Sequence, residues 1–104
     1  MVHATKRLKL QILLEEILGI ENVYFQPPPN IQIKYPCIVY KRNYGITRFA
    51  NNTPYLIGKR YNVVVIDRDP DSEIPGKIEE LPLTLFDRFY TVNNLNHFSF
   101  NTYF

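Results

Sequence analysis

The stretch from residue 60 to residue 66 constrains the fold of this chain more than any other. It ends in the uninterrupted run Val63-Val64-Val65-Ile66. β-Branched side chains fit the pleated surface of a sheet and lose rotamer freedom in a helix. A run in which every side chain is apolar is typical of a strand buried on both faces. We therefore predict that Arg60–Ile66 is a central strand of a sheet.

The partner of this strand is expected to precede it. Cys37–Arg42 is rich in apolar and β-branched residues, and Pro36 disfavours a helix at its start. The segment between the two strands, from Tyr44 to Lys59, is punctuated by glycine, asparagine and proline. These signals predict a long hairpin arm between two core strands.

Two further segments are predicted to be extended. Val23–Phe25 reads as a short strand, which must end at the triplet Pro27–Pro29 because proline cannot donate to a ladder or continue a helix. The C-terminal stretch Leu85–Phe104 alternates aromatic and polar residues around Asn93–Asn96. This pattern predicts a hairpin with an asparagine-rich turn.

Two helices are expected as well. Leucines and isoleucines recur every three or four residues within Thr5–Leu18, which predicts a helix that packs through Leu10, Leu13, Leu14 and Ile17 and ends at Gly19. In the second, shorter helix, Asp71 or Ser72 is the predicted N-cap, Pro82 follows the end, and the core-facing residues are Ile74, Ile78 and Leu81.

These elements define the fold class. A chain of 104 residues with 45% hydrophobic residues can bury one modest core, so residues 1–104 are expected to form one domain. We predict an α+β domain in which an N-terminal helix and one short helix pack on a mainly antiparallel sheet of about four strands with a long hairpin arm. The apolar stretch after Lys9 is too short, and too interrupted by charge, to span a membrane.

No cofactor, metal or catalytic site is expected. Asp67–Glu73 resembles a calcium loop in its alternating carboxylates, but Ser72 and Ile78 stand where such a loop needs glycine and a bidentate acid. Cys37 lies in an apolar strand and is interpreted as a packing residue. His97 lies beside the predicted turn without a nucleophile partner in the sequence. We therefore expect a protein that is not an enzyme.

Several phrases resemble small virion proteins of tailed bacteriophages, and most closely the tail terminator (tail completion, minor tail or head–tail joining) family. They are Tyr24-Phe25-Gln26-Pro27-Pro28, Tyr35-Pro36-Cys37-Ile38-Val39-Tyr40, Tyr61 through Pro75, Phe86-Asp87-Arg88 and Asn94-Leu95-Asn96-His97. The resemblance implies a small α+β subunit of a hexameric ring that caps the tail tube and contacts the tail tube protein and the neck or connector protein. It also implies a virion protein made in the cytoplasm of the bacterial host, with DNA passing through the lumen without specific binding.

The candidate interface or lumen residues come from two segments. The acidic loop supplies Asp67, Arg68, Asp69, Asp71 and Glu73, with Arg68 expected to bridge to a carboxylate, and the arm supplies Tyr44, Arg48 and Tyr55. An alternative from another class is a single-stranded nucleic-acid-binding module that stacks bases on aromatic residues of an open sheet face. The formal net charge of only +2 gives that alternative little electrostatic support.

Overall fold

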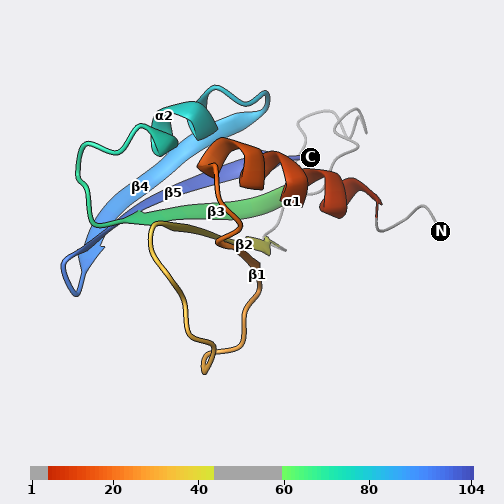
Figure 1. Cartoon of the computed structure of the whole chain (residues 1–104). Helices are drawn as coiled ribbons and strands as arrows, with labels where there is room; N and C mark the ends of the chain where they lie inside the picture. The colour runs from red at the N-terminus through yellow and green to blue at the C-terminus, as the bar shows by residue number, and fades with distance from the viewer. Residues whose placement is uncertain (1–4, 44–59) are drawn as a thin grey trace.

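The fold was taken from a computed structural model, which describes residues 5–43 and 60–104. The described part holds two helices and five strands, and their α+β arrangement is the predicted one (Figure 1). In chain order they are α1 (Thr5–Leu18), β1 (Val23–Phe25), β2 (Cys37–Arg42), β3 (Arg60–Asp67), α2 (Ile74–Glu79), β4 (Thr84–Val92) and β5 (Leu95–Tyr103). The predicted arm, with Tyr44, Arg48 and Tyr55, lies outside the described residues.

The strands form a single sheet in the order β1-β2-β3-β5-β4. β3 is its middle strand, as its continuous apolar run predicts, and it pairs antiparallel with both β2 and β5. The predicted number of about four strands was too low, because β1 joins the sheet by pairing parallel with β2, with Val23 opposite Ile38. A parallel neighbour needs a crossover connection, and the proline-containing segment from residue 26 to residue 36 provides it without a helix.

Both helices lie on the same side of the sheet (Figure 1). α1 contacts β1 and β2, whereas α2 contacts β4 and β5, and the two helices also contact each other. Between helices and sheet lies a core in which Leu10 and Leu14 of α1 meet Ile78 of α2 and the large side chains of Tyr40 and Phe100. The opposite face of the sheet has no helix among the described residues, and we call it the open face.

The face of α1 that packs on the sheet is rotated slightly from the predicted one. Leu10, Leu14 and Leu18 are buried, whereas Leu13 is half-buried and does not belong to the core cluster. Side chains that repeat every four residues lie along one line of the helix, and this line passes Leu13 on its flank. Leu13 was therefore wrongly predicted as a core residue.

α2 starts one residue later than its predicted cap. The N-cap position belongs to Glu73, whose side chain makes no capping hydrogen bond. The predicted Ser72 nevertheless accepts a hydrogen bond at Oγ from the Ile74 backbone N–H at 3.3 Å. Ile78 is fully buried, and Ile74 and Leu81 pack against the core as predicted.

The turn between β4 and β5 has the chemistry that the sequence predicts. Asn93 and Asn94 have φ angles of 53° and 64°, so both lie in the left-handed region. Two consecutive residues with positive φ define a type I′ turn, whose twist matches that of the strands it joins. Asparagine tolerates this region better than other residues with a side chain.

Candidate functional site

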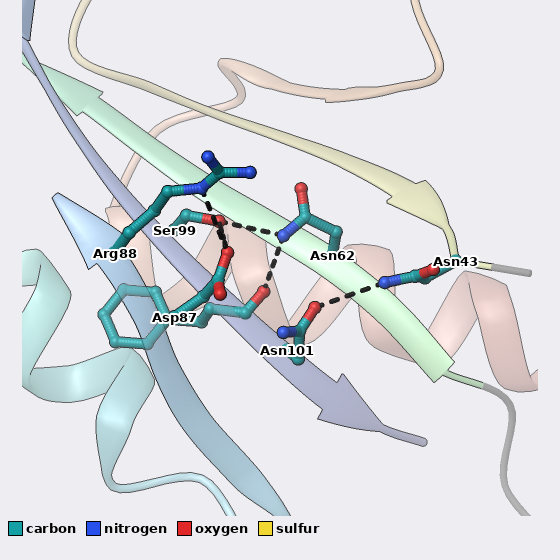
Figure 2. A network of polar contacts seen from close by, with 7 residues as sticks. Asn43, Asn62, Asp87, Arg88, Ser99 and Asn101 are labelled. Atoms are coloured by element: carbon teal, nitrogen blue, oxygen red, sulfur yellow. Dashed lines mark hydrogen bonds and ion pairs between the residues drawn. The ribbon is translucent and has the colours of Figure 1, made fainter. Parts of the chain in front are cut away.

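The open face carries a polar groove of about 510 Å³ along β2, β3, β5 and β4. Strand register explains which side chains reach it, because residues directly opposite each other share a face of the sheet. Lys41, Asn62 and Asn101 form one cross-strand row, and Ser99 and Arg88 belong to the next. Figure 2 shows Asn62, Asn101, Ser99 and Arg88 on the open side, with the helices behind the sheet.

Cationic side chains dominate the groove. Three of them line it from the open face against a single carboxylate, Asp87, and they are Lys41, Arg60 and Arg88. This composition gives the groove a formal surplus of two positive charges. Arg42 borders the groove but lies opposite Tyr61 on the helix side, where its Cζ is 5.5 Å from the centroid of the Tyr61 ring. The groove is therefore suited to an anionic partner.

A β-bulge brings Asp87 and Arg88 to the groove together. The register moves from Phe86 opposite Phe100 to Arg88 opposite Ser99, so Asp87 is the extra residue. Asp87 Oδ2 accepts a hydrogen bond from Ser99 Oγ at 3.2 Å and lies 3.4 Å from Arg88 Nε. Because the Arg88 side chain is 73% exposed, this pair contributes little to stability and leaves the guanidinium accessible.

Amide side chains give the groove floor a fixed geometry (Figure 2). Asn62 Nδ2 donates to Ser99 Oγ at 2.9 Å and to the Phe100 carbonyl at 3.1 Å. Asn43 Nδ2 donates to Asn101 Oδ1 at 3.4 Å. These bonds join β3, β5 and the end of β2, so the cations stand on a rigid sheet.

One aromatic residue closes the groove at its far end. Tyr90 lines the groove and stacks on His97, with ring centroids 4.7 Å apart and an interplanar angle of 18°. One face of the Tyr90 ring is thus already covered. His97 Nδ1 also lies 3.1 Å from the Leu95 carbonyl oxygen, which fits the predicted role of a turn residue with a hydrogen bond.

The predicted acidic loop lies at the other end of β3. Arg60 begins that strand at the groove and Asp67 ends it, so the two are separated by roughly 23 Å at about 3.3 Å per residue. Asp67 Oδ1 accepts from the Asp69 N–H at 3.0 Å, and Asp69 Oδ1 accepts from the Asp71 N–H at 2.9 Å. Asn96 Nδ2 donates to the Asp67 and Arg68 carbonyls, which ties the loop to β5.

The structure places Arg68 differently from its predicted ion pair. Its Cζ lies 5.9 Å from the centroid of the Tyr35 ring. Within residues 5–43 and 60–104 it forms no ion pair with a carboxylate. The carboxylates of Asp69, Asp71 and Glu73 remain exposed beside it.

β4 is an edge strand with apolar side chains on both faces. Leu85, which is 75% exposed, and Val92 belong to the open face, whereas Phe86 and Phe89 belong to the helix side. Phe86 and Phe89 pack edgewise or tilted on Phe100 and Phe98 and stay about half exposed. We call Leu85, Phe86, Phe89 and Val92 the β4 edge patch. An apolar hollow of about 330 Å³ at Leu83, Thr84, Leu85 and Tyr103 continues it.

Sequence reasoning missed the groove, because its cations come from separate strands. The only local signal was the alternation of Arg60 and Asn62 with the apolar Tyr61 and Val63, which marks one polar strand face. The structure brings Arg60 and Asn62 together with Lys41 and Arg88, and it keeps the predicted acidic loop apart from them.

The titratable groups of the core are held in their neutral forms. Cys37 is a free, fully buried thiol, and burial, with a smaller contribution from the Asp67 charge, raises its pKa from 9.0 to about 12. Burial also raises the pKa of Tyr40, against the opposing effect of its hydrogen bond from Arg7. A thiol with such a pKa is a poor nucleophile at neutral pH. Within the described ranges, His, Cys, Asp and Glu form no cluster suited to a metal ion.

Comparisons with protein-family models, curated proteins and solved structures give no match to this chain. Neither described helix has the length and apolar character needed to cross a membrane.

Proposed function

We propose that this chain is a structural virion protein of a tailed bacteriophage, a tail terminator whose copies form a hexameric ring between the tail tube and the neck. The observation that carries the proposal is the β4 edge patch. The assignment to a phage tail comes from the sequence resemblance, and the patch supports the assembly that the resemblance implies.

The argument begins with the exposed edge itself. β4 is nine residues long and has no strand beyond it among the described residues. Proteins protect such edges with charge, proline or short strands because an open edge pairs with other chains. β4 has a bulge and the charges of Asp87 and Arg88 in its middle, but on either side of them it carries four large apolar side chains that are about half exposed or more. Apolar patches of this kind mark protein–protein interfaces.

The partners expected for such a subunit are further copies of itself, the tail tube protein and the neck or connector protein. DNA would pass through the ring without specific contacts. We propose no catalytic role, because the buried Cys37 thiol is held protonated and His97 is engaged by Tyr90 and by a backbone carbonyl.

A second candidate, a single-stranded nucleic-acid-binding module, is favoured by the cationic groove on the open face. Binding of this kind combines basic grooves with aromatic platforms on which successive bases stack. The groove offers Tyr90 alone, and His97 covers one face of its ring. The phenylalanines of β4 project to the helix side, so we favour the ring subunit.

Native mass spectrometry and light scattering test the proposal on the full chain, alone and mixed with purified tail tubes. We expect the wild type to form closed rings or to bind tube ends. The variant Leu85→Lys/Phe89→Lys should remain monomeric and leave the tubes bare. The matched control is Ile12→Lys/Ile20→Lys. It places the same two charges at exposed apolar positions, one within α1 and one just after it. Assembly of the β4 variant at the wild-type level would refute the role of this edge.

A further inference from the structure

We propose that the cationic groove of one copy binds the acidic loop of the next copy, so that subunits associate head to tail. This inference rests on the proposed ring subunit and names the second contact of that ring. The partner is thus an acidic segment, Asp67–Glu73, of a second copy of this chain.

The first step is the unbalanced charge of the groove. Within the described part of the chain, Lys41 and Arg60 have no carboxylate partner, and Asp87 contacts only Arg88 among the cations. Lys41 and Arg60 are therefore available to an anionic partner on another molecule.

The second step is the matching charge of the loop. Four carboxylates and one guanidinium lie within seven residues, a formal surplus of three negative charges that is opposite in sign to the surplus of the groove. Asp67 and Asp69 each use Oδ1 to hold the loop backbone. Their other carboxylate oxygens have no hydrogen-bond donor among the described residues and can accept from a guanidinium or ammonium group.

The third step is the separation of the two surfaces. The groove cations Lys41 and Arg60 lie at the start of β3 and the loop follows its end, so the loop of one copy does not contact these cations in the same copy. Two complementary surfaces at opposite ends of a rigid body make a heterologous contact, which generates rings when the rotation closes. Two residues that line the groove, Arg88 and Tyr90, belong to β4. The groove therefore adjoins the β4 edge patch.

An acidic protein segment fits the groove better than a nucleic acid does. Asn101 accepts from Asn43 through its Oδ1, so its Nδ2 can donate to a carboxylate of the loop, whereas Asn62 Nδ2 already donates to Ser99 and Phe100. The single partly covered ring of Tyr90 offers no series of stacking platforms.

Charge reversal tests the contact by analytical ultracentrifugation at low salt. The groove variant Lys41→Glu/Arg60→Glu and the loop variant Asp69→Lys/Asp71→Lys should each lower the association constant by roughly tenfold or more. An equimolar mixture of the two variants should recover association, because every groove then meets a loop of opposite charge. Lys9→Glu/Lys77→Glu, which reverses exposed cations away from the groove, is the control.

Disulfide trapping tests the same contact where association is transient. The double variant Asp71→Cys/Asn101→Cys should give ladders of dimers, trimers and larger species under mild oxidation. Each single variant should stop at dimers, and the buried Cys37 should not contribute. Ladder formation should fall with increasing salt, since the contact is between charges near the surface.

The outcomes separate this inference from the proposed function. Rings that are lost in Leu85→Lys/Phe89→Lys but unaffected by charge reversal overturn the groove–loop contact and keep the ring. Failure of the mixture to recover association, or the absence of ladders, also overturns the contact. If the groove variant instead loses salt-dependent binding of oligothymidylate while the loop variant keeps it, the groove is a nucleic-acid site and the inference is wrong.

Discussion

At the scale of single residues, Cys37 reports on the core through its protonation. Its thiol is fully buried at the start of β2, and this burial raises its pKa to about 12. An unfolded chain ionises this thiol near pH 9, whereas the folded chain keeps the proton, so the unfolded state gains stability as the pH rises. The contribution of Cys37 to folding is thus complete below pH 9 and is lost between about pH 9 and 12.

We predict that this loss is visible as a difference between two proteins. The unfolding free energy of the wild type, measured in urea, should fall relative to that of Cys37→Ala above pH 9, by up to about 1.4 kcal/mol per pH unit. The comparison cancels the titration of tyrosines and lysines common to both proteins. Parallel curves for the two proteins between pH 8 and 11 would show that the thiol ionises equally in both states.

Tyr40 couples α1 to the sheet through its hydroxyl group. The hydroxyl donates to Gln11 Oε1 at 2.6 Å and accepts from Arg7 at 3.1 Å, while the ring is buried against Phe25. Tyr40→Phe keeps the ring and leaves the Gln11 oxygen without its donor, so it should destabilise the fold by about 1–3 kcal/mol in urea unfolding. Tyr24→Phe, which removes a 3.4 Å bond at an exposed site, is the control and should cost much less. Equal losses in the two variants would contradict this assignment.

At the scale of elements, the β4–β5 hairpin depends on its two asparagines. Both have positive φ angles, which cost a β-branched residue more than they cost asparagine or glycine. Asn93→Val/Asn94→Val should therefore lower the unfolding free energy by about 1–2 kcal/mol per residue, whereas Asn93→Gly/Asn94→Gly should leave it close to the wild type. Thr91→Val replaces one β-branched residue of β4 by an apolar one of the same shape and controls for hydrophobicity. A valine variant as stable as the glycine variant would rule out the type I′ turn.

The elements that the sequence predicts well are those specified by neighbouring residues. The Val63–Ile66 run, the asparagine turn and the leucine repeat of α1 each carry their own signal, and the structure confirms the strand, the hairpin and the helix. The parallel pairing of β1 depends on how the chain crosses over between Phe25 and Cys37, which no local pattern specifies. The rotation of α1 that buries Leu18 and leaves Leu13 on the flank depends on the shape of the opposing sheet.

The groove shows the same limit for a site. Lys41, Arg60 and Arg88 meet only because β2, β3, β5 and β4 adopt one register. The position of Arg88 also depends on the bulge at Asp87, which shifts the outer part of β4 by one residue. A one-residue change in register would move alternate side chains to the other face. The acidic loop, by contrast, is contiguous in sequence, so its composition alone predicts a candidate interface.

At the scale of the whole molecule, the two proposed assembly surfaces differ in the symmetry of the contacts they would make. An edge strand such as β4 can pair antiparallel with the same strand of a second copy, which makes an isologous contact and closes at two subunits. The groove–loop contact joins two different surfaces and therefore continues from copy to copy. A ring requires the heterologous contact. The charged groove and loop would therefore favour rings over the dimers that the apolar β4 edge could form by itself.

This difference leads to a prediction about stoichiometry. Asp67→Asn/Asp69→Asn/Asp71→Asn keeps the oxygen atoms that accept the loop's backbone hydrogen bonds and removes most of its charge. The variant should fold with an unchanged melting temperature, lose the heterologous contact and shift from rings to dimers formed through β4. Native mass spectrometry measures the shift directly, and Glu16→Gln/Glu79→Gln/Glu80→Gln removes the same number of exposed carboxylates elsewhere as a control. Rings of wild-type mass from the loop variant would mean that the ring forms through the β4 edge patch without the groove–loop contact. If the loop variant forms dimers and these dissociate when Leu85→Lys/Phe89→Lys is introduced into the same chain, the remaining contact is made by β4.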